Sequence, residues 1–396
     1  MDMLQTRIYV VPPMNEKHPT YSQPSLRFYN AATQSIIDSI WNLLQNGLWR
    51  EYQIDNRLYN DELGEMRIGE WEPIFPNIHP IYPGYDWDIS SNQLVEHRFV
   101  PQHIENVNLN TFLDVAHQYF LQFQGKKIGV HLSGGLDSSL IICLLHYFHI
   151  PFVLGGITTT RYEFRTEHRI QQVLSEYGDD VFLIDAEEYS FYSGLLDMPK
   201  HQIPDSYIKS NVSSRKLAQE FAARGVNVVM SGQGADTLFV DAVPKTGANS
   251  YNIGNEFDIP FEHDLIYAPY GVDLQSFYAY PPLIEQIHNL RRGQREDAYK
   301  IWARQFFKEF LPRELSEFHY CADFFGLSMS GLEQAKPDIA KLFEEARTLL
   351  PHPIFSEENT KTLLNTNVFN FDYKAYCAFC VQVSIAAWLH ALLRKD

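Results

Sequence analysis

The chain has 396 residues, of which 45% are hydrophobic, 14% aromatic and 20% charged. This composition excludes a fibrous or disordered protein, and the length suits two domains with a substantial core. The formal net charge is -17, from 32 basic and 49 acidic residues, and no basic cluster stands out, so we expect no nucleic-acid partner. Four cysteines, no signal-peptide pattern and no apolar run of about 18 residues predict a soluble, cytoplasmic protein without a membrane partner.

The first part of the chain, residues 1–107, has the pattern of a small domain of its own. It is rich in Pro, Tyr, Trp and Asn, it contains one helical pattern at residues 31–49, and prolines interrupt residues 73–83. We therefore predict a small N-terminal α+β domain, followed by a main domain over residues 108–396.

The main domain opens with an alternation of helices and strands. Helical patterns occupy residues 110–123, 140–148, 167–177 and 213–224, and short apolar runs typical of buried strands occupy residues 128–132, 152–157, 181–184 and 226–230. This alternation predicts an α/β fold with a doubly wound, mostly parallel sheet. The C-terminal part becomes helical, with the longest candidates at residues 295–309, 331–350 and 373–393.

The segment SGGLDSS at residues 133–139 lies between a predicted strand and a predicted helix. Such a loop can direct backbone amides and a helix N-terminus at an anion. Its two glycines allow positive φ and close approach of the anion, its serines supply hydroxyl donors, and Asp137 can hold a divalent cation. The spacing is neither that of the Walker loop nor that of the GxGxxG dinucleotide motif. A serine-rich helix cap is the alternative that needs no ligand.

Two motifs together carry a resemblance to a known family. SGGLDSS is similar to the signature of the N-type ATP pyrophosphatases, and its Leu-Asp-Ser-Ser ending is most similar to the asparagine synthetase branch. SGQGADTLF at residues 231–239, after another predicted strand, resembles the second motif of that branch, SGEGADELF. The resemblance implies an adenine nucleotide alpha hydrolase-like fold, the use of ATP, and Mg²⁺ held by Asp137 and Asp236. It also implies an ATP site formed by Leu132, Ser133, Gly134, Gly135, Leu136, Asp137, Ser138, Ser139, Ile157, Ser231, Gly232 and Gly234, in which Leu132 and Ile157 line the adenine pocket.

The same resemblance implies cleavage of ATP between the α and β phosphates. A carboxylate is converted to an acyl-adenylate because AMP is a better leaving group than oxide, and an amine then forms the amide. Family members that use glutamine begin with a catalytic cysteine after the initiator methionine, whereas this chain begins Met-Asp-Met, so we expect no glutamine hydrolysis.

The expected substrate follows from the missing cysteine. In this respect the chain resembles β-lactam synthetases and lasso-peptide cyclases, in which the attacking amine belongs to the substrate. We expect a small molecule or peptide that carries both a carboxylate and an amine, with free ammonia or a second amine as alternatives. A homo-oligomer or a biosynthetic partner protein stays open.

The chain departs from the family's pattern at residues that bear on catalysis. Gln233 stands where the family has Glu, Thr237 replaces an acid, and the family's late lysine falls near Tyr320 or Cys321. A neutral amide cannot act as a general base near neutral pH, so base catalysis must come from elsewhere. A nucleotide-binding pseudoenzyme or regulatory module that retains the loop, and an enzyme that acts on tRNA, are the alternatives. The candidate catalytic residues, as hydrogen-bond donors or as the missing cation, are Tyr320, Lys245, Lys300 and Gln233.

Overall fold

The computed structural model describes residues 4–9, 26–52, 75–204, 208–256, 262–317, 325–370 and 373–394. Contacts between residues divide the chain into two compact units that interleave along the sequence. The first unit comprises Met1–Ser25, Pro83–Asp185 and Arg215–Ala322, and the second comprises Leu26–Tyr82, Ala186–Ser214 and Asp323–Asp396. The expected domain boundary between residues 107 and 108 stays a prediction.

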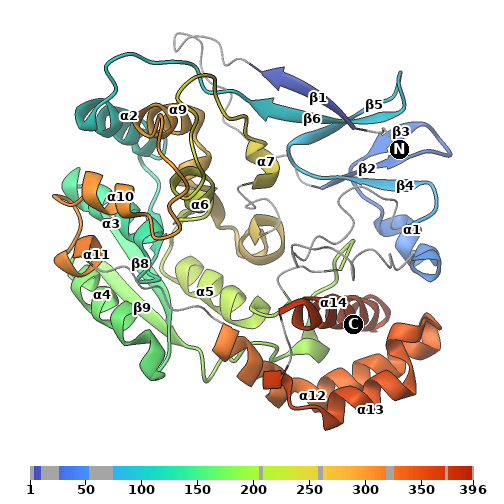
Figure 1. Ribbon diagram of the computed structural model, residues 1–396. Helices are drawn as coiled ribbons and strands as arrows, with labels where there is room; N and C mark the ends of the chain where they lie inside the picture. Colours follow the sequence, from blue (N-terminus) through green and yellow to red (C-terminus); the bar gives the residue numbers. More distant parts are fainter. Residues whose placement is uncertain are drawn as a thin grey trace. The chain divides into compact units, whose positions relative to one another are not determined.

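A five-stranded sheet organises the first unit (Figure 1). Its strands are all parallel and follow the order β11-β10-β7-β8-β9. Their bounds are β7 Ile128–His131, β8 Phe152–Thr158, β9 Asp180–Asp185, β10 Val228–Ser231 and β11 Asp273–Ser276. The predicted parallel sheet is confirmed. β11 was not predicted, because its sequence DLQS has only one apolar residue.

The helices that lie wholly or mostly in the first unit are short. They are α2 Leu109–Leu121, α3 Leu136–Tyr147, α4 Arg165–Ser175, α5 Asn211–Ala223, α6 Ala235–Phe239, α7 Ile253–Glu256, α9 Pro281–Leu290, α10 Ile301–Phe306 and α11 Arg313–Glu317. Single turns of 3-10 or π geometry lie at Tyr162–Phe164, His263–Tyr267, Ala268–Tyr270 and Phe277–Ala279. A second, mixed sheet joins β1 Leu4–Tyr9, β6 Gln93–Phe99 and β5 Tyr85–Asp88.

Helices cover both faces of the five-stranded sheet. On one face, alternate strand residues such as Val130 and Leu154 share a buried core with side chains of α2, α3 and α9. On the other face, the ring of Phe221 from α5 lies against Gly129 and Gly155, where an added Cβ would come within 2.7 Å and 2.5 Å of the ring. Because successive strand residues point to opposite faces, α5 lies opposite the other three helices, and the fold is doubly wound as expected.

The direction of strand addition reverses at β7. β8 and β9 extend from one side of β7, whereas β10 and β11 extend from the other. In such sheets, ligands bind at the carboxyl ends of the two strands that flank the reversal, because the connections there diverge to opposite faces. SGGLDSS follows β7 and SGQGADTLF begins at the last residue of β10, so both motifs lie at this position.

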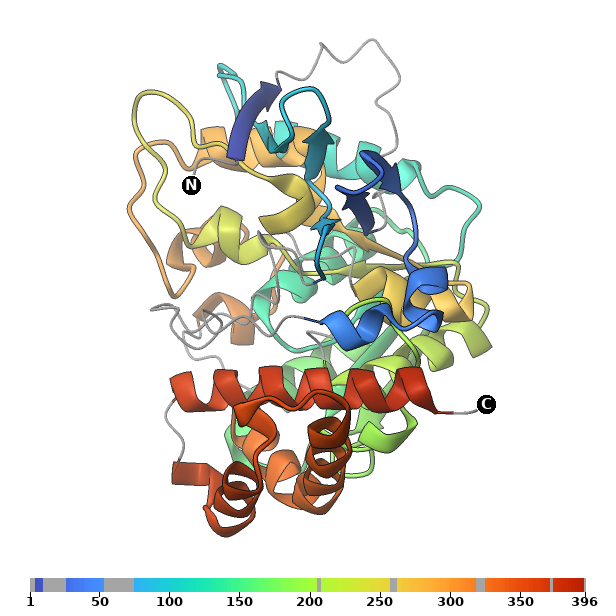
Figure 2. The ribbon, with the colours of Figure 1, turned by 90° about the vertical axis from the view of Figure 1, so that its right-hand side faces the viewer.

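The second unit combines an antiparallel sheet, in the order β3-β2-β4, with helices from the C-terminal part of the chain. In Figure 2 α14 is the red helix; α12, the longest helix of the described residues, lies beside α14 and also contacts α13. Among the described residues, no helix combines the length and the apolar sequence that a membrane span would require. The elements are β2 Arg27–Asn30, β3 Ser35–Ile37, β4 Ile78–Ile81, α1 Trp41–Gln45, α12 Phe325–Leu349, α13 Glu357–Asn365 and α14 Tyr373–Leu393, with 3-10 turns at Leu48–Glu51, Leu195–Asp197, Pro353–Phe355 and Val368–Asn370.

Two predicted helices are wrong in extent. Residues 31–49 form a turn, β3 and α1 rather than one helix, because the Asn30 side chain accepts hydrogen bonds from the amides of Ala32 and Thr33 and closes a hairpin between β2 and β3. Residues 295–309 contain only the short helix α10, because Lys300 adopts a left-handed φ of 54° directly before it. The other predicted helices and strands lie close to their observed positions.

Acid should destabilise the first unit through a buried histidine. Burial lowers the pKa of His288 to about 4, and Arg292 and Arg291 add to the effect. Because the unfolded chain takes up this proton first, near its ordinary pKa of about 6.5, stability present above that pH is lost as the pH falls toward 4, by about 3 kcal/mol in all. Urea unfolding of the wild type and of His288→Asn at several pH values measures this. Identical pH dependence in both proteins would contradict the assignment.

Candidate active site

The SGGLDSS segment turns sharply from β7 into α3. The helix begins at Leu136, so Asp137 lies in its first turn, where free backbone amides and the helix dipole present positive charge. Gly134 has a φ of 81°, and a Cβ there would lie 2.7 Å from the backbone of Glu167 in α4. Both constraints favour glycine at this position. The loop is therefore held tightly between the sheet and α4, as a site for an anion requires.

The serines of this segment are tied to each other and to the loop backbone. The hydroxyl of Ser133 accepts a hydrogen bond from the Gly135 amide (3.1 Å) and shares one with the hydroxyl of Ser138 (2.7 Å). The hydroxyl of Ser139 donates to the Gly135 carbonyl (2.5 Å). Ser138 and Ser139 are buried, whereas Ser133 is exposed. Ser133 is thus the hydroxyl of this loop most available to a ligand.

The second motif packs directly onto the first. The Gln233 amide donates to the hydroxyl of Ser231 (3.2 Å), and Gly234 has a φ of 81° before α6 begins. A Cβ on Gly232 would lie 2.7 Å from the amide nitrogen of Ser138 and 3.0 Å from the carbonyl carbon of Asp137. Only glycine allows the two motifs to approach this closely.

Gly232→Ala should therefore separate the two motifs. Backbone atoms of α3 cannot move aside as a flexible side chain would, so we expect a loss of about 2 kcal/mol of stability together with weaker nucleotide binding. Thermal unfolding and calorimetric titration with Mg·ATP measure the two effects. Wild-type values for both would show that the observed contact is not required.

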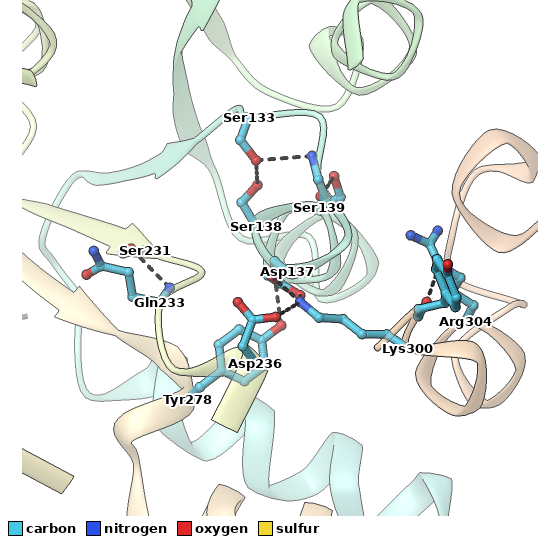
Figure 3. A network of polar contacts seen from close by, with 12 residues as sticks. Ser133, Asp137, Ser138, Ser139, Ser231, Gln233, Asp236, Tyr278, Lys300 and Arg304 are labelled. Carbon is cyan, nitrogen blue, oxygen red and sulfur yellow. Dashed lines mark hydrogen bonds and ion pairs between the residues drawn. The ribbon is translucent and has the colours of Figure 1, made fainter. Parts of the chain in front are cut away.

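The two predicted metal ligands meet at one lysine (Figure 3). The ammonium of Lys300 lies 2.7 Å and 2.6 Å from the two carboxylate oxygens of Asp137, and 2.6 Å from Oδ1 of Asp236. The Lys300 side chain is 12% exposed, that of Asp137 25% and that of Asp236 77%, so the cluster is open on the Asp236 side. The Tyr278 hydroxyl donates a hydrogen bond to the backbone carbonyl of Asp137 (2.9 Å), which holds this residue of the cluster in place.

Lys300 reaches the cluster because its loop is fastened to α6. The Arg291 guanidinium donates to the Leu238 carbonyl, and the Asp297 amide donates to the Val240 carbonyl (2.8 Å). The left-handed φ of Lys300 then turns the chain into α10. These contacts place the lysine beside Asp236, which stands on the same short helix α6.

The charges of the cluster modify one another. Burial raises the pKa of the Asp137 carboxyl, and the Lys300 charge opposes this shift. Burial alone would lower the pKa of the Lys300 ammonium, but the charges of Asp137 and Asp236 and their hydrogen bonds outweigh it, so its pKa lies above the ordinary value. Lys300 is therefore charged at neutral pH and balances one of the two carboxylates.

The donor set fits Mg²⁺ that arrives with phosphate. Asp137 and Asp236 already direct carboxylate oxygens at one shared cation, the Lys300 ammonium. Mg²⁺ is usually bound by one or two carboxylates together with substrate phosphates and water. Within the described part of the chain, no group of three or more His, Cys, Asp or Glu side chains could hold a metal ion. Phosphate or water oxygens would have to complete the coordination.

The other predicted catalytic residues are placed differently. Lys245 is exposed, and the ion pairs found for Asp137 and Asp236 do not include it. Gln233 lies at the second motif, where its carbonyl accepts a hydrogen bond from the Ser276 hydroxyl (2.8 Å). Its side-chain oxygen is buried and has no partner among the described residues. Tyr320 lies outside the described residues.

Leu132 and Ile157, the predicted adenine contacts, lie at the carboxyl ends of neighbouring strands. Their carbonyls accept hydrogen bonds from one side-chain amide, that of Gln171 in α4, at 2.9 Å and 3.0 Å. Sequence reasoning missed both Gln171 and Tyr278. A single polar residue in a helical pattern, or a tyrosine in an aromatic-rich stretch, carries no signal of such a contact.

Comparison with known proteins agrees with the geometry of the two motifs. The family description "Asparagine synthase" matches residues 121–323, just over half of the chain. No curated protein matches. Among solved structures, the NH3-dependent NAD synthetase from Campylobacter jejuni, in complex with the nitrate ion, is 11% identical. The alignment covers 66% of this chain and 93% of that chain with a TM-score of 0.31, a level at which the likeness carries no argument. The matched region contains both motifs and Lys300, and the chain belongs to the asparagine synthase family.

Proposed function

We propose that this chain joins a carboxylate and an amine into an amide through an acyl-adenylate, releasing AMP and pyrophosphate. The observation that carries the proposal is the convergence of Asp137, Asp236 and Lys300 where the two motifs meet. The family supports an ATP-using ligase. The identity of the bond that is cleaved and the nature of the acid and amine are our inference.

Each group of the site has a proposed task in the adenylation step. Asp137 and Asp236 would hold Mg²⁺, which when bound supplies positive charge to the departing pyrophosphate. The free amides at the start of α3 and the hydroxyl of Ser133 would donate to phosphate oxygens. The Lys300 ammonium, which contacts the carboxylates of Asp137 and Asp236, could release one of them and bind a phosphate oxygen in its place. Together these groups would stabilise charge that develops only in the transition state, which is what accelerates a reaction.

Gln233 is proposed to orient the amine. Its buried side-chain oxygen can accept a hydrogen bond from an N–H group, but a neutral amide cannot take up the proton. The proton would therefore leave to another base. We propose that the amine belongs to the carboxylate-bearing substrate or to a peptide.

A nucleotide-binding regulatory module is the second candidate. Gln233 and Thr237 stand where the family's second motif has acids, so binding without turnover would leave the observed cluster intact. The two functions differ in whether bound ATP is ever cleaved.

Trapping with hydroxylamine tests the proposal without knowledge of the natural amine. Purified protein, Mg·ATP and hydroxylamine are mixed with single members of a panel of amino acids, peptides and other acids. An acyl-adenylate would be converted to a hydroxamate, with AMP and pyrophosphate formed in equal amounts. Binding of ATP with no AMP formed from any acid in the panel would instead favour the regulatory module.

A further inference from the structure

Gln171 connects two strands at the edge of the sheet where the nucleotide is proposed to bind. It lies in the middle of α4 and is 3% exposed. Its side-chain nitrogen donates to the carbonyl of Leu132, directly before SGGLDSS, and to the carbonyl of Ile157 in β8. These distances are 2.9 Å and 3.0 Å, so both N–H groups of the amide are used.

The two carbonyls lie where β7 and β8 separate. The last paired residues are His131 and Gly155, and the Leu132 amide still donates to the Gly155 carbonyl (2.8 Å). Beyond this point the chain after β7 turns into the loop, whereas β8 continues. The Leu132 carbonyl comes so close to Gly156 that an added Cβ would lie 2.2 Å from it. Gln171 therefore replaces the ladder hydrogen bonds that end here.

The orientation of the Gln171 amide is determined by its partners. Carbonyl oxygens only accept hydrogen bonds, so the nitrogen of the amide must face them and the side-chain oxygen must point away. That oxygen is buried and has no partner among the described residues. A buried acceptor without a partner is unfavourable. In return for this unpaired oxygen, the two hydrogen bonds from the Gln171 nitrogen hold the carbonyls of Leu132 and Ile157 at a fixed distance from each other.

We propose that Gln171 is a positioning residue for the adenine base. It does not touch the nucleotide, but it sets the orientation and spacing of the main chain at Leu132 and Ile157. This inference rests on the proposed function and on the expectation, from the resemblance of the motifs, that Leu132 and Ile157 line the adenine pocket. Each carbonyl has a second lone pair, which can accept from the 6-amino group of adenine, whereas guanine has an acceptor at that position. Gln171 thereby favours ATP over GTP without contacting the phosphates.

Calorimetric titration of Gln171→Met tests this role, because methionine keeps the volume and lacks the donors. Gln172→Met is the matched control, since Gln172 is the next residue of α4 and is exposed. The probes are Mg·ATP, Mg·GTP and Mg·tripolyphosphate. We expect the Kd for Mg·ATP to rise about tenfold in Gln171→Met, corresponding to the loss of hydrogen bonds that fix the site. Binding of Mg·tripolyphosphate and of Mg·GTP should change less than about twofold, and Gln172→Met should match the wild type.

A second variant, Gln171→Glu, keeps the inference testable if Gln171→Met does not fold. In Gln171→Glu a protonated carboxyl can still donate one hydrogen bond, whereas the ionised form repels both carbonyls. Its deficit in Mg·ATP binding relative to the wild type should therefore shrink as the pH is lowered. Unchanged binding of Mg·ATP in both variants, or equal losses for Mg·ATP and Mg·tripolyphosphate, would overturn the inference. If the wild type itself fails to bind Mg·ATP, the proposed function fails first.

Discussion

Replacement of Asp137 by asparagine is expected to lower the rate of AMP and pyrophosphate formation on the order of a hundred- to a thousandfold. Asparagine keeps the size of the side chain but removes the charge that Mg²⁺ requires. Asp236 would then be the remaining carboxylate of the cluster, and its side chain is 77% exposed, so it cannot hold the ion firmly by itself. The rate is measured as pyrophosphate release under saturating Mg·ATP.

The control for this variant is Asp114→Asn, an exposed aspartate in α2 of the same unit. It should keep the wild-type rate. Asp137→Asn should remain folded, because Lys300 can still pair with Asp236. A folded Asp137→Asn protein with the wild-type rate would remove Asp137 from the proposed metal site.

Lys300→Met is expected to lower both activity and stability. Loss of the ammonium should slow turnover on the order of a hundredfold, because a cation at the departing phosphate is lost. Without Mg²⁺ it also leaves two carboxylates facing each other, which should destabilise the protein by about 2 kcal/mol, since partial exposure screens their repulsion. Mg²⁺ alone should therefore raise the Tm of Lys300→Met more than that of the wild type.

Lys245→Met provides the matched comparison, because Lys245 was the other lysine considered from the sequence and is exposed. It should alter neither the rate nor the response of the Tm to Mg²⁺. If Lys245→Met is the slower variant, or if Mg²⁺ raises the Tm of all three proteins equally, Lys300 does not have the proposed role.

The sequence predicts the parts of the site that depend on local pattern. Both motifs follow apolar strands, and the parallel sheet then brings their loops to the same edge. The resemblance of the two motifs to the family implied Asp137 and Asp236 as a pair, and the structure brings them to one cation. Strand β11 was missed because three of its four residues, Asp273, Gln275 and Ser276, are polar and form side-chain hydrogen bonds, so its pattern is not apolar.

The place of Lys300 could not be read from the sequence. It contacts Asp137 across 163 residues, and the local pattern predicts that it lies inside a continuous helix over residues 295–309. The observed position depends on a left-handed φ and on hydrogen bonds from its loop to α6. Such long-range contacts leave no periodic signal. The same is true of Gln171, whose partners belong to two different strands.

Product analysis with ATP labelled in the α and γ phosphates tests the central claim most directly. The two motifs and the Asp137–Lys300–Asp236 cluster predict that, once a suitable acid is supplied, the α label appears in AMP and the γ label in pyrophosphate, in equal amounts. ADP and inorganic phosphate as the primary products would mean cleavage between the β and γ phosphates. That result would contradict the proposed adenylation whatever the acid.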